Sequence, residues 1–294
     1  SLKNQRWIVE EKAGYQAEFS KIKTLLLGLA ELKTIEAKTA KAENYGRLGV
    51  QAVGEPGEAN SKQVQLLNKA GSQLYTIIVG KRKETRIPGG KPSVYVRESG
   101  KAKSWLVSGK IAIPSSQADW LNKKIININP SEIQSIKILQ ADDSQLVVSK
   151  QAKSDSHYSI ENLPANAKLK SEGVADSLAN TLQNLSFEDV LKRSAFQANE
   201  EQTVHISYKT FDGLVLHAKL LEKDGKHFLW FDVKTSSTDD AIVKKSNDLN
   251  ANFALWVYEI PAYKAETLNK KLEDLIKAEE PNVSEPNPDK TDEK

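Results

Sequence analysis

The 294-residue chain contains no cysteine and no methionine. Without cysteine it can form no disulfide, use no thiolate nucleophile and offer no cysteine ligand to zinc. It also lacks an apolar run near the ~20 residues that a membrane-spanning helix needs. The longest run, residues 22–32, contains Lys23 and Glu31. The net charge is only +3, so the chain as a whole has no field that favours nucleic acid or membrane lipid.

Catalytic motifs are equally scarce. The Gly-x-Ser-x-Gly elbow of serine hydrolases does not occur, and Gly89-Gly90-Lys91 lacks the spacing of a phosphate-binding loop. Acidic residues are abundant, but no pair has the distinctive setting that a glycosidase needs. Asp142-Asp143 and Asp239-Asp240 are typical of turns and helix starts. The sequence therefore predicts a non-enzymatic protein that uses no cofactor.

The composition that remains is that of an ordinary globular protein, with 39% hydrophobic and 28% charged residues. The length suggests about two domains. Residues 19–32 predict an amphipathic helix, although Gly28 weakens its helix propensity. Its apolar stripe consists of Leu25, Leu29 and Leu32, with Phe19, Ile22 and Leu26 beside them.

The same order of predicted elements recurs later in the chain. An aromatic opener at residues 7–9 is matched at residues 158–160, and a second leucine stripe predicts another helix at residues 178–185. That stripe consists of Leu178, Leu182 and Leu185. Strands are predicted at 64–67, 74–79 and 93–97 after the first helix, and at 204–209, 214–221 and 227–233 after the second.

A third, partial copy follows at residues 256–276, where a helix carries Leu268, Leu272, Leu275 and Ile276 on one face. The predicted fold is therefore α+β. It has two internally repeated units of antiparallel strands, each packed with an amphipathic helix, and a C-terminal partial repeat that ends in a helix. The predicted boundaries are 1–120 and 121–240 for the units, 241–278 for the partial repeat, and 279–294 for a disordered acidic tail.

A further strand pair, at residues 133–139 and 146–150, precedes the opener of the second unit. The first unit begins at Ser1-Leu2-Lys3, which aligns with Val148-Ser149-Lys150. We therefore expect the first hairpin to be truncated here and the native protein to extend further toward its N-terminus.

Two histidines meet on the predicted hairpin of residues 204–221. A three-residue loop at residues 211–213 fixes its register and makes His205 and His217 diagonal neighbours on one face, with Lys219 opposite His205. A catalytic zinc normally takes three protein ligands, and this pattern places no carboxylate on that face. We expect a solvated sheet face and no metal site.

One local charge feature is a candidate interaction surface, because basic residues surround the Pro88-Gly89-Gly90 loop between two predicted strands. This surface could bind an anionic lipid headgroup, an anionic glycan or an acidic partner, and a solvated loop without a ligand is the alternative. Nucleic acid is not expected, because its binding favours aromatic residues among the basic ones. The basic residues are Lys81, Arg82, Lys83, Arg86, Lys91 and Arg97.

Several segments together resemble the bacterial domain-of-unknown-function family 4340. The resemblance covers nearly the whole chain apart from the tail, and its motifs are structural. The segments that carry it are residues 7–50, Val79-Gly80-Lys81, residues 94–97, Trp105-Leu106, Trp120-Leu121, residues 209–214, residues 223–228 and residues 258–268.

Members of that family typically have one N-terminal membrane helix and an exported body. They are commonly encoded beside an ABC-type permease and a gliding-motility-type auxiliary transport protein. The resemblance therefore implies a periplasmic, non-enzymatic accessory or scaffold domain of an ABC-type transport assembly. It would be anchored to the inner membrane by a segment absent from this chain, with the permease and auxiliary subunits as partners. An envelope lipid- or glycan-binding module that uses the basic loop is the alternative. The family brings no catalytic residues.

Overall fold

The computed structural model describes residues 1–55, 61–83, 92–161 and 163–277. The chain divides into two compact units. Unit 1 comprises residues 1–9 and 16–122, and unit 2 comprises residues 10–15 and the chain from residue 123 onward. The fold is α+β with antiparallel sheets, as the sequence predicts. The segment from residue 241 to 277, predicted as a partial third repeat, lies in unit 2.

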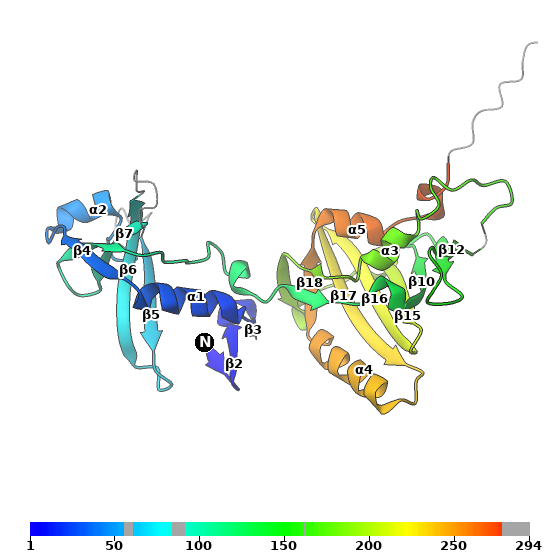
Figure 1. Ribbon diagram of the computed structural model, residues 1–294, viewed down its shortest axis with the longest axis horizontal. Helices are drawn as coiled ribbons and strands as arrows, with labels where there is room; N and C mark the ends of the chain where they lie inside the picture. The colour runs from blue at the N-terminus through cyan, green and yellow to red at the C-terminus, as the bar shows by residue number, and fades with distance from the viewer. Residues whose placement is uncertain (56–60, 84–91, 162, 278–294) are drawn as a thin grey trace, which may run out of the picture. The chain divides into compact units, whose positions relative to one another are not determined.

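Unit 1 is built on a five-stranded antiparallel sheet in the order β4-β8-β7-β6-β5 (Figure 1). A short hairpin of β1 (Leu2–Lys3) and β2 (Arg6–Val9) belongs to the same unit. The three predicted strands are found within a few residues of their expected ends. The sheet strands are β4 (Lys33–Ala37), β5 (Lys62–Leu67), β6 (Gln73–Lys83), β7 (Ser93–Glu98) and β8 (Ser104–Ser108).

The predicted first helix is α1 (Phe19–Ala30), which covers one face of this sheet. The Glu18 side chain caps it by accepting from the Ser20 amide at 3.1 Å. Close packing requires a glycine at position 28, because a Cβ there would lie 2.5 Å from the carbonyl oxygen of Lys110. Leu25, Leu29 and Leu32 pack on the sheet as predicted, whereas Phe19 and Leu26 are exposed.

The opposite face of the unit 1 sheet is covered by a loop that contains the one-turn helix α2 (Tyr45–Leu48). Here Tyr45 and Val50 pack with Ile78 of β6. The sheet of unit 1 therefore has a small apolar core on each side, and β6 contributes to both because its successive side chains alternate between the faces.

Unit 2 is built on an eight-stranded sheet in the order β12-β11-β10-β15-β16-β17-β18-β14 (Figure 1). The predicted register of the central hairpin is confirmed, with Val204 opposite Leu220 and Ile206 opposite Ala218. A separate pair joins β9 (Lys124–Ile126) and β13 (Leu185–Ser186). The sheet strands are β10 (Ile133–Leu139), β11 (Gln145–Ser149), β12 (Ser159–Ile160), β14 (Asp189–Lys192), β15 (Val204–Thr210), β16 (Leu214–Lys223), β17 (Lys226–Thr235) and β18 (Trp256–Ile260).

The helices of unit 2 differ from the predicted ones. The second helix, α3 (Asp176–Asn180), is shorter than predicted, because the chain takes a positive φ of 51° at Asn184 and places Leu185 in β13. The last helix, α5 (Ala262–Leu268), likewise ends before Leu272, which begins a short 3-10 turn. None of the described helices has the length and apolarity that crossing a membrane requires.

An unpredicted helix, α4 (Asp240–Phe253), separates β17 from β18. The Asp239 carboxylate caps it by accepting from the Ala241 and Ile242 amides at 2.8 and 3.3 Å, so Asp239-Asp240 has the second of the two roles considered for it, turn or helix start. Phe253 at its other end packs on Phe231 of β17, with ring centroids 5.0 Å apart.

The N-terminal segment Glu10–Tyr15 is part of unit 2. The Tyr15 ring packs edge-on against Phe187 and Trp256, with centroids 5.3 and 4.9 Å away, and burial raises the pKa of its hydroxyl to about 12. The Lys12 ammonium lies 2.6 Å from the Asp189 carboxylate. These contacts fasten an early part of the chain to a sheet formed by much later residues.

Five strands of unit 2 follow the strand order of unit 1. Within the larger sheet, β14-β18-β17-β16-β15 has the same connectivity as β4-β8-β7-β6-β5. In each set of five, the strand that comes first in the chain, β4 or β14, lies at an edge beside the strand that comes last, β8 or β18. Unit 2 then continues beyond β15 with β10, β11 and β12, whereas β5 is the last strand of the unit 1 sheet in the part of the chain that the structure describes.

Candidate functional site

The basic residues singled out by the sequence do not form one surface. Lys81, Arg82 and Lys83 end β6, where successive side chains point to opposite faces. The Lys81 ammonium donates to the carbonyl oxygen of Arg47 at 3.1 Å, on the side of α2. The Arg82 guanidinium donates to the carbonyl oxygen of Ile111 at 3.1 Å, on the side of α1. The strand geometry therefore divides the basic cluster between the two faces of the sheet.

Arg97 is a correction to the predicted surface, because only 7% of it is exposed. Its Nε donates to the carbonyl oxygen of Val50 at 2.9 Å and its Nη1 to that of Lys101 at 3.1 Å. Its guanidinium also lies 4.3 Å from the centroid of the Tyr45 ring. Arg97 thus holds the loop on the α2 face in place. Arg86 and Lys91 lie outside the described residues.

The exposed end of Arg82 lies at a hollow of about 470 Å³ in unit 1. Its wall includes Lys21, which the sequence analysis missed because one lysine on an amphipathic helix gives no signal. The Lys21 ammonium bonds to the carbonyl oxygen of Asp119, so both cations at this hollow already hold backbone partners. The other lining residues are Ser20, Thr24, Ala112, Ile113, Pro114, Ser115 and Asp119.

The histidine pair of unit 2 lies on the polar face of β15 and β16, as predicted. His217 Nδ1 lies 2.9 Å from Ser207 Oγ. The expectation that this face has no carboxylate is wrong, because β17 places Asp232 opposite His217. Glu200, from the segment before β15, also places a carboxylate oxygen 3.8 Å from His205 Nε2. A pattern drawn from one hairpin misses what the third strand and the preceding loop contribute.

The surroundings of His217 favour its neutral form. Partial burial lowers the pKa of His217, and the nearby Lys234 lowers it further, while Asp232 opposes them. A neutral imidazole keeps one ring nitrogen as a hydrogen-bond acceptor, a state suited to pairing with the hydroxyl of Ser207.

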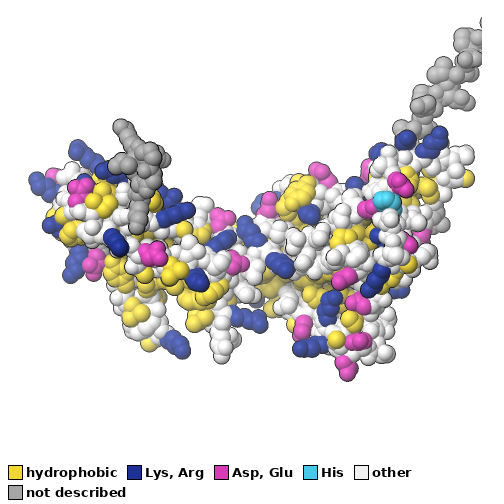
Figure 2. Space-filling model, in the orientation of Figure 1, with side chains coloured by type: hydrophobic (Ala, Val, Ile, Leu, Met, Phe, Trp, Pro, Cys, Tyr) yellow, Lys and Arg dark blue, Asp and Glu magenta, His cyan; other side chains and the backbone are white. Residues whose placement is uncertain are grey.

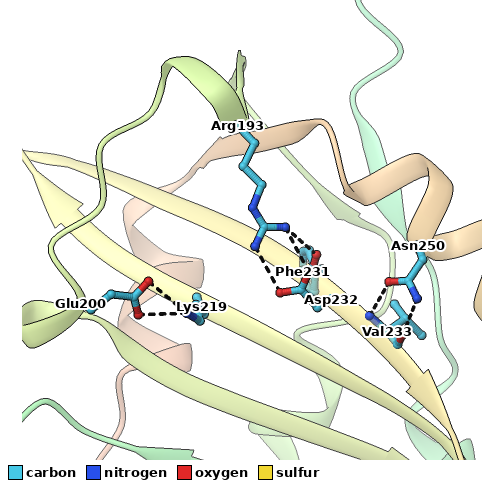
Figure 3. A network of polar contacts seen from close by, with 7 residues as sticks. All are labelled: Arg193, Glu200, Lys219, Phe231, Asp232, Val233 and Asn250. Atoms are coloured by element: carbon cyan, nitrogen blue, oxygen red, sulfur yellow. Dashed lines mark hydrogen bonds and ion pairs between the residues drawn. The ribbon is translucent and has the colours of Figure 1, made fainter.

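Ion pairs connect this face to the chain that precedes it, and Figure 3 shows the network. Arg193 donates to both carboxylate oxygens of Asp232, at 3.1 and 3.2 Å. The Lys219 ammonium donates to both carboxylate oxygens of Glu200, at 3.0 and 2.9 Å. These bonds anchor the segment between β14 and β15 across the polar face of β16 and β17.

Asn250 of α4 completes the network at the edge of β17. Beyond Leu229, β17 has no register partner in β18, and the Asn250 amide takes that place (Figure 3). Its Oδ1 accepts from the Val233 amide at 2.7 Å, and its Nδ2 donates to the Val233 carbonyl oxygen. A helix side chain thus supplies the bonds that a neighbouring strand would make.

The polar face borders an open hollow of about 610 Å³. The contacts among the lining residues limit the chemistry that the hollow can support. A serine–histidine–aspartate relay requires the carboxylate to orient the histidine, whereas here Arg193 bonds both oxygens of Asp232. Within the described ranges, no three His, Cys, Asp or Glu side chains are placed to hold a metal ion. The lining residues are His205, Ile206, Ser207, His217, Ala218, Lys219, Asp232, Val233, Lys234 and Asn250.

Unit 1 presents a different surface, an apolar groove of about 300 Å³ on the α1 face of its sheet. Exposed apolar residues flank the groove on the β5–β6 hairpin, where Leu67 is 52% and Leu74 66% exposed. Figure 2 shows apolar side chains gathered along α1 and on this hairpin. The groove is lined by Leu29, Leu32, Thr34, Tyr75, Ile77, Val96, Glu98, Trp105 and Val107.

The fold and these surfaces define an α+β protein of two antiparallel-sheet units, one with a polar hollow and one with an apolar groove. A family model described as "Domain of unknown function (DUF4340)" matches residues 7–205, and the chain belongs to this family. The match runs from β2 into β15, so it includes most of unit 1 and the first part of unit 2. No curated protein and no solved structure matches the chain.

Proposed function

We propose that this protein is a non-enzymatic accessory or scaffold domain of an ABC-type membrane transport assembly. It works in the periplasm and is anchored to the inner membrane. The observation that carries this proposal is the apolar surface of unit 1, where the β5–β6 hairpin and the outer side of α1 expose large apolar side chains beside the groove. Exposed apolar side chains gathered as Figure 2 shows typically mark a site of interaction with another protein.

The proposal includes a common origin for the two units as copies of one module. The shared strand order β4-β8-β7-β6-β5 and β14-β18-β17-β16-β15 supports this, as does the helix that precedes each edge strand. Where two copies of a module differ in completeness, the less complete copy is the better candidate for a docking surface, because its apolar residues lack an internal cover.

The partners proposed are an ABC-type permease and its auxiliary transport subunits. The resemblance to a family commonly encoded beside such components supports this choice. Capture of the full-length anchored protein from membranes solubilised in mild detergent should recover both kinds of subunit. Failure to recover either, when the permease and auxiliary subunits still recover each other, would contradict the proposal.

An anionic lipid or glycan bound near the end of β6 is the alternative function. The hollow beside Arg82 favours it, because two cations, Arg82 and Lys21, stand there beside an apolar wall. Flotation with vesicles that contain anionic lipid tests it, and retention on an anionic polysaccharide matrix tests the glycan form. Arg82→Glu combined with Lys21→Glu should weaken retention, whereas Lys234→Glu in unit 2 should not. Equal retention of all three proteins would reject this alternative.

A further inference from the structure

The outer side of β15 shows how this fold covers a sheet edge. There β10 pairs with β15 in antiparallel register, from Ile133 opposite Thr210 to Leu139 opposite His205. Its isoleucines are fully buried, with Ile133 and Ile136 at 0% and Ile138 at 1% exposure. The added strand therefore brings both backbone bonds and branched apolar side chains to the core.

In unit 1, β5 stands at the place in the strand order that β15 has in unit 2, but among the described residues it has a neighbouring strand on one side only. The consequence is visible in its core-facing residues. Val64 and Leu66 are half-buried, whereas Ile206 and Tyr208 of β15 are each 1% exposed. Among the described residues, the apolar side chains of β5 thus lack the cover that β10 gives to β15.

The two edges of the unit 1 sheet differ in their protection against added strands. The β4 edge carries Lys33 and Glu36 and has an irregular register between Thr34 and Glu36, and charges and bulges both discourage pairing. The β5 edge has one lysine at its start, followed by an uncharged run from Gln63 to Leu67. It is the less protected edge, and it lies beside the exposed Tyr75 and Leu74.

We propose that β5 binds an extended segment of a partner subunit as an added antiparallel strand, an inference that rests on the proposed function. Main-chain hydrogen bonds to residues 62–67 supply the affinity. Alternate branched apolar side chains on the α1 side give the specificity, as the isoleucines of β10 do on β15. The segment that fits is uncharged on that side and polar on the other.

The test uses the full-length protein and its captured transport subunits. Gln65→Pro and Val64→Pro are prepared as two separate single variants. Both are needed because hydrogen-bonded and outward-facing backbone groups alternate along an antiparallel edge strand. One of the two therefore removes an outward donor and keeps the bonds to β6, and thermal unfolding identifies it. The double variant Gln63→Lys, Gln65→Lys places two positive charges at exposed positions of β5. These charges should discourage strand pairing without the use of proline. Ile35→Pro on β4 is the matched control.

The β5 variants that keep the wild-type unfolding temperature should recover about tenfold less of the transport subunits, because strand addition supplies much of the affinity. The Ile35→Pro control should recover them as the wild type does. Hydrogen exchange at residues 62–67 should also slow in the complex. Unchanged recovery with the β5 variants would overturn the added strand and leave the scaffold function standing. Absence of the subunits from the wild-type capture would overturn both.

A second copy of this chain is the competing occupant of the β5 edge. Sedimentation of the purified protein over a range of concentrations distinguishes a second copy from a segment of a partner subunit. A monomer supports a foreign strand. A dimer that Gln63→Lys, Gln65→Lys dissociates would overturn the assignment to a partner subunit.

Discussion

The two sheets share a strand order but bury their equivalent strands to different extents. In unit 2, Ile206 and Tyr208 of β15 are each 1% exposed, and β10 pairs with β15 on their outer side. In unit 1, Val64 and Leu66 of β5 have the same alternating pattern and remain half-buried. The comparison teaches that an alternating pattern gives the direction of a side chain, while its burial depends on whether another strand follows.

The largest expected effect tests this difference in burial directly. Ile206→Ala should lower the free energy of unfolding of unit 2 by about 2–5 kcal/mol, the range for large core residues cut to alanine. Val64→Ala in unit 1 should cost only about 1 kcal/mol, since each fully buried CH₂ group contributes about 0.8 kcal/mol and this side chain is half-buried. Native-state hydrogen exchange, followed separately in the two units, measures both losses. Equal losses would show that β5 is as well covered as β15.

The central part of unit 2 could be predicted from the sequence. The three-residue turn at residues 211–213 and the alternation on either side were enough to give the register of β15 and β16. The leucine stripe likewise predicted the buried side of α1. Both are local signals, in which the residues that decide the structure lie within one helix or one hairpin.

The errors have non-local causes. Leu178, Leu182 and Leu185 have helical spacing, yet Leu185 joins β13 because the chain pairs there with Ile126. The basic cluster around residue 82 is contiguous in sequence, but Lys81 and Arg82 bond to distant carbonyl oxygens on opposite faces of the sheet. Asp232 reaches the histidine face from a strand that the hairpin pattern does not include. In each case, a neighbour distant in sequence overrides the local pattern.

A second prediction concerns how unit 2 completes the backbone bonds of β17 beyond the end of its pairing with β18. Asn250→Ala would leave the amide and carbonyl of Val233, a residue 2% exposed, without the partners that α4 provides. Leaving buried polar groups unpaired costs about 1–3 kcal/mol, so urea unfolding should show a loss of that size. Asn247→Ala, at an exposed position of the same helix, is the control and should change stability little. A loss equal to the control would mean that water replaces the amide bonds at this edge.

The smallest expected effect is a pH dependence confined to unit 2. His217 has a pKa lowered chiefly by partial burial and then by Lys234, so its folded state favours the neutral ring. Protonation therefore favours unfolding. The contribution of neutral His217 to the free energy of unfolding is fully present above the ordinary histidine pKa of about 6.5. It is lost as the pH falls through the lower pKa of the folded state. The free energy of unfolding of unit 2 should decrease on acidification through this window, and His217→Gln should make the decrease shallower. If the free energy of unfolding of unit 2 fell equally steeply with pH in the wild type and in His217→Gln, the acid sensitivity would come from another group. The polar hollow of unit 2 would then be no more responsive to pH than the apolar groove of unit 1.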